Sequence, residues 1–179
     1  MDKLWAPWRV GYLYSKKKGG CIFCDSLKSK KKTFVILKNK HSFAVLNKYP
    51  YNNGHVLVAP LRHTGDISGL KDEEILDLFK TLVQSKDVLI RALKPAGFNI
   101  GINIGEPAGA GITGHLHIHI VPRWKGDTNF MPVVYNTKII SQSLEALYNL
   151  LKKQKKQGRL CIQSGAVFTS YRKGVPDRR

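Results

Sequence analysis

The chain has 179 residues, of which 42% are hydrophobic and 23% are charged, so length and composition are those of a globular domain with a buried core. No apolar run approaches the ~20 residues that a membrane-spanning helix needs. Residues 1–13 also lack the continuous apolar stretch of a secretory signal. We therefore expect a cytoplasmic protein that does not enter a membrane.

The formal net charge of +18 is concentrated at the two ends of the chain. Residues 1–32 carry a net charge of +7 and residues 152–179 carry +8, whereas residues 33–151 carry only +3. Basic ends of this kind are typical of solvated arms, and they also attract polyanionic substrates or bind nucleic acid weakly. Because the central region is nearly neutral, we favour solvated arms and keep nucleic-acid binding as the alternative.

The first predicted elements are three short strands. Residues 33–37 and 42–46 are apolar and are joined by a short polar link, which predicts an antiparallel hairpin. A turn rich in Asn, Pro and Gly at residues 49–54 leads to a third strand at residues 55–59, which we expect to end at Pro60.

A long helix is predicted next, over residues 71–93. Three acidic residues at its start suit the positive end of the helix dipole, and the Pro and Gly that follow residue 93 end it. The apolar residues that recur at helical spacing, and so predict the buried face, are Ile75, Phe79, Leu82, Leu89 and Leu93.

The remaining elements complete an α+β pattern. Residues 98–104 predict a fourth strand, residues 105–114 a glycine-rich loop, and residues 115–121 a fifth strand. A last amphipathic helix is marked by Ile140, Leu144, Leu147 and Leu151. We expect an antiparallel sheet of about five strands with helices packed on one side. In this division, residues 1–20 form an aromatic arm, residues 21–155 the folded domain, and residues 156–179 a basic tail.

Three histidines in the fifth strand carry the strongest functional signal. His115, His117 and His119 stand at alternate positions, so in a strand they project from one face while the apolar residues between them face the core. A neutral imidazole can attack an electrophile at pH 7, bind a metal, or donate to a phosphate oxygen. A half-exposed strand with chance histidines is the alternative, but half of the six histidines on one face argues against it.

Two further motifs indicate chemistry. Glycines at positions such as Gly109 and Gly111 let backbone N–H groups approach phosphate oxygens, although a plain flexible turn explains the loop equally well by itself. Cys21 and Cys24 form a Cys-x-x-Cys pair, which in a reducing compartment suggests a metal or redox role.

Together these motifs resemble those of the histidine triad (HIT) superfamily. Residues 115–121 match its alternating histidine motif, and residues 47–62 and 103–122 resemble its second and third blocks. The resemblance covers residues 21–125. Residues 4–12 and 122–130 are similar to a narrower group, the microbial diadenosine tetraphosphate phosphorylases of the fragile-histidine-triad-like branch.

The resemblance implies an enzyme that transfers nucleotidyl groups on dinucleoside polyphosphates. His117 would attack the α-phosphorus and form a nucleotidyl-histidine intermediate, His119 would contact the phosphates and assist the leaving group, and His55 would orient the triad. The other residues implied in substrate binding are Asn47 at the ribose, Asn103 at the phosphate chain, and Gly109, Gly111 and Thr113 in the loop. No organic cofactor is implied.

A structural zinc ion is also implied by the resemblance, with Cys21, Cys24, His63 and His115 as its ligands. Two thiolates and two neutral imidazoles complete a tetrahedral zinc shell, which here would tie the N-terminal segment to the histidine strand. The alternatives are a reduced dithiol and a surface His63.

Several functions stay open at this stage. The acceptor of the nucleotidyl group is water in a hydrolase and inorganic phosphate in a phosphorylase. The resemblance also implies a homodimer or higher oligomer, joined edge to edge or through the long helix. Alternative functions are a nucleoside phosphoramidase or general nucleotidyl hydrolase of the same superfamily, a DNA-end deadenylase, and a nucleotide-binding regulatory module without catalysis.

Overall fold

The computed structural model describes residues 20–29, 33–127 and 140–163. The predicted aromatic arm up to residue 19 and the basic tail from residue 164 lie outside these ranges, so the division into arm, domain and tail stays a prediction. Among the helices described, none combines the length and apolarity that crossing a bilayer requires.

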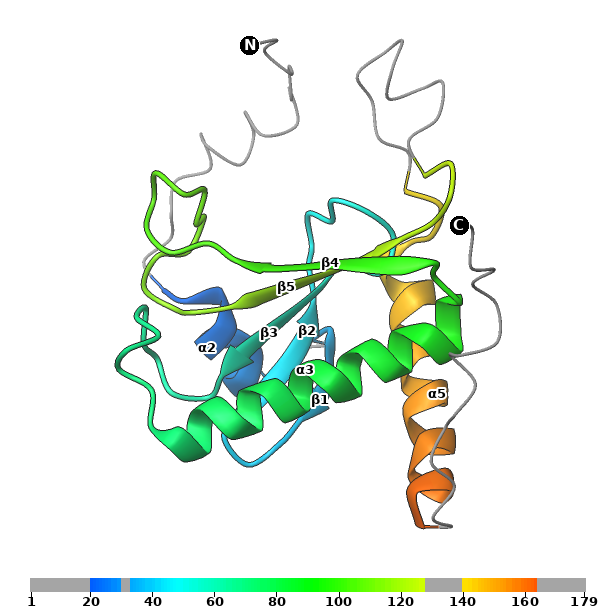
Figure 1. Ribbon diagram of the computed structural model, residues 1–179, viewed down its shortest axis with the longest axis horizontal. Coiled ribbons are helices and arrows are strands. Elements are labelled where there is room, and N and C mark those ends of the chain that lie inside the picture. Colours follow the sequence, from blue (N-terminus) through cyan, green and yellow to red (C-terminus); the bar gives the residue numbers. More distant parts are fainter. Residues whose placement is uncertain (1–19, 30–32, 128–139, 164–179) are drawn as a thin grey trace, which may run out of the picture.

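Five antiparallel strands form one sheet in the order β1-β2-β3-β5-β4 (Figure 1). The strands are β1 (Val35–Lys38), β2 (Ser42–Leu46), β3 (Val56–Pro60), β4 (Gly97–Ile102) and β5 (Ile118–Arg123). Every residue of β2 and β3 is buried, because both faces of the sheet are covered there. The predicted five-stranded antiparallel sheet and its first hairpin are confirmed.

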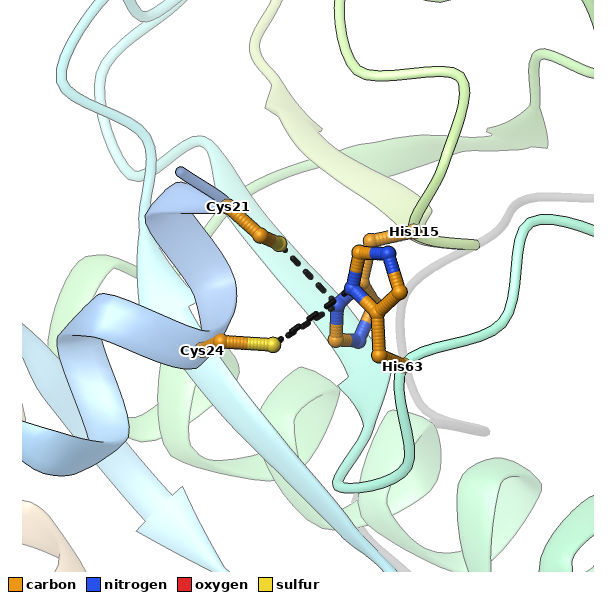
Figure 2. Close-up of side chains that lie close together, drawn as sticks. All are labelled: Cys21, Cys24, His63 and His115. Atoms are coloured by element: carbon orange, nitrogen blue, oxygen red, sulfur yellow. Dashed lines mark hydrogen bonds between the residues drawn. The ribbon is translucent and has the colours of Figure 1, made fainter. Parts of the chain in front are cut away.

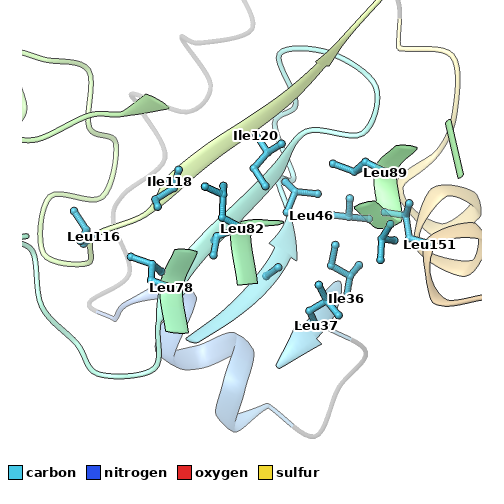
Figure 3. Close-up of a cluster of buried hydrophobic side chains, with 14 of the residues drawn as sticks. Ile36, Leu37, Leu46, Leu78, Leu82, Leu89, Leu116, Ile118, Ile120 and Leu151 are labelled. Atoms are coloured by element: carbon cyan, nitrogen blue, oxygen red, sulfur yellow. The ribbon is translucent and has the colours of Figure 1, made fainter. Parts of the chain in front are cut away.

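Two long helices cover one face of the sheet, as expected. They are α3 (Asp72–Leu93) and α5 (Leu144–Gln163). Figure 3 shows the core between them and the sheet, where Ile118 and Ile120 of β5 meet Leu82 and Leu89 of α3 and Leu151 of α5. The predicted extent of the long helix is confirmed to within one residue.

The opposite face is covered by a third, short helix that the sequence did not predict. This helix, α2 (Ile22–Lys28), packs Phe23 against Phe43 of β2 and Leu57 and Ala59 of β3. Seven residues are fewer than two helical turns, too few for a periodic pattern to stand out. The helices are therefore not all on one side, and the face covered by α2 is the one that carries the histidines.

The predicted buried face of α3 is partly wrong. Ile75 and Phe79 are 36% and 50% exposed, whereas Leu78, Leu82 and Leu89 form the buried side. The apolar arc of this helix is wider than its contact with the sheet, so residues at one edge of the arc are left uncovered.

Some predicted boundaries are also wrong. The last helix begins at Leu144 and excludes Ile140, because Ser143 accepts a hydrogen bond from the backbone N–H of Ala146 at 3.2 Å and caps the first turn. β4 ends at Ile102, and β5 begins at Ile118 rather than at residue 115. β3 pairs with β5 only as far as Ile118, so the preceding residues are held by other contacts.

Candidate active site

The alternation of side chains predicted for the histidine segment is confirmed, although its first residues precede the strand. Leu116, like Ile118 and Ile120, is buried in the core against the long helices. The histidine rings lie on the side covered by α2, where the ring centroids of His117 and His119 are 5.0 Å apart. This face is not half exposed, since His115 and His117 are only 0% and 5% exposed.

The ring of His117 is held in one tautomer by a hydrogen bond to the backbone of His115. Its Nδ1 lies 2.8 Å from the carbonyl oxygen of His115. Because a carbonyl oxygen can only accept, Nδ1 carries the proton and Nε2 carries the lone pair. Burial lowers the pKa of His117, so the ring is neutral at pH 7 and its Nε2 is a competent nucleophile.

A chain of hydrogen bonds sets the tautomer of His119. The backbone N–H of Tyr51 donates to Nδ1 of His55 at 3.1 Å, which leaves the proton of His55 on Nε2. That Nε2 lies 2.9 Å from Nδ1 of His119, which must accept. His119 therefore carries its proton on Nε2, and in the described part of the chain this buried nitrogen has no hydrogen-bond partner.

The electrostatics of this pair keep both rings neutral. Burial, followed by repulsion from His119 and His117, lowers the pKa of His55 to about 3. Burial, followed by repulsion from His117, lowers the pKa of His119 to about 4. A buried N–H donor without a protein partner is unfavourable by itself, so the Nε2–H of His119 can donate to an oxygen of a water or of a bound ligand.

Asn47, expected at the ribose, contacts His55 in this structure. Its Nδ2 lies 3.2 Å from Nδ1 of His55, and its Oδ1 accepts the backbone N–H of Tyr49 at 2.9 Å. The side chain is partly buried. Asn47 therefore supports the histidine pair, and its contact with a ribose stays a prediction.

The glycine-rich loop is folded partly onto itself. Gly105 and Gly109 have φ angles of +82° and +88°, which favour glycine. The backbone N–H of Gly109 donates to the carbonyl oxygen of Glu106 at 2.9 Å, and that of Ala110 donates to the carbonyl oxygen of Gly105 at 3.2 Å. Both N–H groups therefore already have hydrogen-bond partners within the loop. Asn103 donates to the Gly109 carbonyl at 3.4 Å.

Gly111 and Thr113, two further residues expected to bind phosphate, are exposed in the same loop. They lie closer along the chain to the histidines than Gly109 does. Phosphate binding by the loop residues stays a prediction.

The four predicted metal ligands are brought together at the other end of the histidine row (Figure 2). Their ligand atoms, two Sγ and one nitrogen from each imidazole, all lie within 4.8 Å of one another. The Sγ–Nδ1 distances are 3.2 Å for Cys21–His115, 3.5 Å for Cys24–His63 and 3.7 Å for Cys24–His115. A tetrahedral zinc ion separates sulfur and nitrogen ligands by about 3.5 Å, so these residues fit the ion.

The orientation of His115 agrees with a role as ligand. Its Nε2 lies 2.9 Å from the carbonyl oxygen of Pro60 and donates to it. The lone pair is thereby on Nδ1, the atom that faces both cysteines, and such an outer hydrogen bond is typical of metal-bound histidines.

Backbone and ion-pair contacts hold the two loops that carry the imidazole ligands. The N–H of Leu116 donates to the Thr64 carbonyl at 2.6 Å, which joins the segment of His115 to the loop of His63. Arg62 forms a bidentate ion pair with Glu74 of α3, with Nε–Oε1 and Nη2–Oε2 distances of 2.9 and 2.6 Å. The hydrogen bonds from Arg62 are the main cause that lowers the pKa of Glu74 to about 2.

Sequence reasoning missed two aromatic residues that contact the histidines. The ring centroid of Phe23 lies 5.0 Å from those of both His115 and His117. The Tyr51 ring lies 4.7 Å from that of His55 and is stacked on His119 at 5.8 Å and 12°. In the sequence, Phe23 lies between the two cysteines and Tyr51 lies four residues before His55. This closeness to site residues was the sequence feature that could have indicated both aromatic contacts.

Comparison with known proteins gives consistent matches. The HIT domain family model matches residues 28–126, more than half of the chain. An AP-4-A phosphorylase of Mycobacterium tuberculosis (strain ATCC 25618 / H37Rv) is 35% identical over 161 residues, which cover 84% of this chain and 83% of the relative. The bis(5'-nucleosyl)-tetraphosphatase (asymmetrical) of Schizosaccharomyces pombe is 35% identical over 102 residues, 57% of this chain and 56% of that protein.

A solved structure agrees in fold. The Zn-bound histidine triad family protein from Mycobacterium smegmatis aligns with a TM-score of 0.66 and 25% identity, covering 79% of this chain and 96% of that one. The region matched by the family model includes all three histidines of the row and His55.

Proposed function

The chain belongs to the HIT domain family, and from this premise we propose that it transfers a nucleotidyl group from a dinucleoside polyphosphate to inorganic phosphate or water. Two relatives, an AP-4-A phosphorylase and a bis(5'-nucleosyl)-tetraphosphatase, support this substrate class. The observation that carries the proposal is the set of hydrogen-bond partners around the two rings, which leaves a lone pair on Nε2 of His117 and a proton on Nε2 of His119.

In the first step, Nε2 of His117 attacks the α-phosphorus in line with the leaving oxygen. A nitrogen–phosphorus bond forms, the bond from phosphorus to the bridging oxygen breaks, and its electron pair departs with the remaining polyphosphate. The His115 carbonyl, bonded to Nδ1–H, stabilises the positive charge that develops on the ring. The Nε2–H of His119 donates to the leaving oxygen and stabilises its negative charge.

In the second step, the acceptor displaces the nucleotide from His117 and restores the lone pair. With diadenosine tetraphosphate, the first step releases ATP and leaves an adenylyl group on the enzyme. Attack by inorganic phosphate then gives ADP, whereas attack by water gives AMP and a proton. Splitting the displacement into two steps at one nitrogen is the advantage of the covalent intermediate.

The remaining site residues position the reacting groups. His55 keeps His119 in the donor tautomer, and Asn47 holds His55. We assign the phosphate chain to Asn103, Gly109, Gly111 and Thr113, which lie in or beside the loop that precedes the histidines. Phosphoryl chemistry depends mainly on positioning and charge stabilisation, which such a set supplies.

The test is incubation of the purified protein with diadenosine tetraphosphate, with and without phosphate, followed by separation of the nucleotides. Formation of ADP and ATP that requires phosphate supports a phosphorylase, and formation of AMP and ATP without phosphate supports a hydrolase. Turnover of an adenosine phosphoramidate alone, or of adenylylated DNA ends alone, would replace the proposal by one of the alternatives.

We further propose that the cluster of Cys21, Cys24, His63 and His115 holds a structural zinc ion. The donor set and its spacing support this, and so does a Zn-bound relative. The bound ion would supply a closed four-ligand link between α2 and the histidine segment, with no position left for substrate. Elemental analysis should find one zinc ion per chain in the wild type and none in Cys24→Ser. A wild type that contains no zinc after expression with added zinc would contradict the proposal.

We also propose a homodimer, which two exposed features of the described residues support. Ile75, Leu76, Phe79 and Val83 form an exposed apolar stripe on α3, and β4 is an edge strand with Ile100 48% exposed. We propose that a second copy either covers the stripe or pairs with β4, since an exposed apolar surface and an edge strand each favour association. Sedimentation should show a dimer that Phe79→Glu dissociates, and a monomeric wild type contradicts the proposed dimer.

The cytoplasmic location stays a prediction from composition.

A further inference from the structure

We propose that Phe23 is a positioning residue that couples the metal-binding cluster to the ring of His117. The inference rests on the proposed function, because it takes His117 as the nucleophile. It concerns a side chain that is neither one of the proposed metal ligands nor one of the residues assigned to the substrate.

Phe23 lies between the two groups that it would couple. On α2 it stands between Cys21 and Cys24, and it is 1% exposed. Its ring centroid is 5.0 Å from that of His115, at an interplanar angle of 47°, and 5.0 Å from that of His117, at 40°. One side chain therefore packs against both a metal ligand and the nucleophile.

The position of α2 depends on the cluster. A helix of seven residues is not stable by itself, and Cys21 at its N-terminus makes no side-chain capping hydrogen bond. Within the described residues, the helix is attached to the sheet through the apolar contacts of Phe23 and Leu27 and through the two thiols that face His63 and His115. Filling the cluster with zinc would fix the helix, and with it the ring of Phe23.

The ring of His117 depends in turn on Phe23. Its Nδ1 is held by one hydrogen bond, to the His115 carbonyl, and this bond alone permits the ring to tilt. Phe23 packs against the ring and His119 lies beside it. A tilt would move the Nε2 lone pair out of line with the phosphorus, and a misplacement of that kind costs about 10- to 100-fold in rate.

The test compares Phe23→Leu with Phe43→Leu as a matched control. Phe43 is 0% exposed in the same apolar cluster and meets the Phe23 ring at 6.2 Å, but among the described residues its ring contacts no histidine ring. Both substitutions remove a ring from the same cluster. We expect Phe23→Leu to lower kcat about 10-fold or more with an unchanged KM, whereas Phe43→Leu leaves kcat unchanged.

A second arm uses zinc itself. Removing zinc from the wild type with a chelator, and adding it back, should lower and restore kcat. The same treatment of Phe23→Leu should have a much smaller effect, because coupled changes are not additive. Histidine nitrogen NMR should give the Nδ1–H tautomer for His117 in both proteins, with a narrow ring signal in the zinc-loaded wild type and a signal broadened by ring motion in Phe23→Leu.

The outcomes separate the two proposals. Equal losses of kcat in the two leucine variants, additive effects of substitution and zinc removal, or an unchanged His117 signal overturn the positioning role. A wild type that turns over no dinucleoside polyphosphate overturns the proposed function instead, and the NMR comparison then still decides whether Phe23 positions the ring.

Discussion

Two groups of buried polar side chains, one on each face of the sheet, differ in whether their hydrogen bonds are satisfied. Toward the long helices, Ser42 and Thr81 are 0% exposed, and Ser42 donates to Asp77 at 2.6 Å and lies 2.7 Å from the Thr81 hydroxyl. Toward α2, the Nε2 of His119 is buried without a partner among the described residues. A satisfied network stabilises a fold, whereas an unsatisfied donor beside a lone pair is useful only when a ligand arrives.

This difference predicts that substitutions on the two faces separate stability from activity. A change toward the long helices should alter the free energy of unfolding and leave the chemistry of the folded protein intact. A change in the histidine row should do the reverse. The following experiments test that separation, beginning with the largest expected effect.

Substitution of the nucleophile should give the largest change. His117→Gln removes the lone pair at Nε2, so we expect kcat to fall on the order of 10⁴-fold or more, with no covalent nucleotide after a denaturing quench at alkaline pH, where a phosphorus–nitrogen bond to histidine is stable. His41→Gln is the control, since His41 lies in the turn before β2, outside the site. A labelled intermediate that persists in His117→Gln would contradict the assigned nucleophile.

Truncation of the core should affect stability alone. Leu89 is 0% exposed, and Leu89→Ala should lower the free energy of unfolding by about 2–5 kcal/mol in urea titrations. The kcat of the folded fraction should not change. Lys153→Ala, at an exposed position on α5, should cost no more than about 0.5 kcal/mol. A large loss of kcat in Leu89→Ala would mean that the two faces are not separable.

The buried histidine pair should make stability depend on pH. The pKa of His55 is about 3 in the fold against 6.5 for the free imidazole, so between these values the unfolded chain binds a proton that the folded chain does not. Stability is therefore complete above pH 6.5 and falls as the pH decreases toward 3, by about 1.4 kcal/mol per pH unit from this group.

Urea titrations from pH 7 to 4 check this dependence by comparing the wild type with His55→Gln. The variant should show a shallower loss of stability. Parallel curves for the two proteins would mean that His55 is not held neutral in the fold.

The ion pair behind the His63 loop should give the smallest effect. Glu74→Gln removes the partner of Arg62 and should lower the melting temperature by a few degrees at pH 7. Because the pKa of Glu74 is lowered to about 2, its contribution is present above pH 4.5 and is lost as the pH falls toward 2. Glu73→Gln, whose carboxylate is 59% exposed, is the control. Equal melting temperatures for the two variants would show that the pair is not stabilising.

Local patterns predicted the elements whose periodicity is strong. β2 and the extent of α3 were predicted to within one residue, because a run of apolar residues and a long helical repeat are each unambiguous. The short helix α2 was missed, and Ile75 and Phe79 were placed in the core although they are exposed. Periodicity identifies the apolar arc of a helix, but the neighbouring elements decide how much of that arc is covered.

The sequence by itself determined that His115, His117 and His119 share one side of the chain, since side chains in an extended backbone alternate with period two. Only the tertiary structure decided which nitrogen of each ring carries the proton. For His119 the partner is His55, 64 residues away, and for His115 it is Pro60, 55 residues away, whereas His117 bonds to the His115 carbonyl in its own segment. The cluster of two cysteines and two histidines likewise joins residues 94 positions apart, because packing and hydrogen bonding act through space and not along the chain.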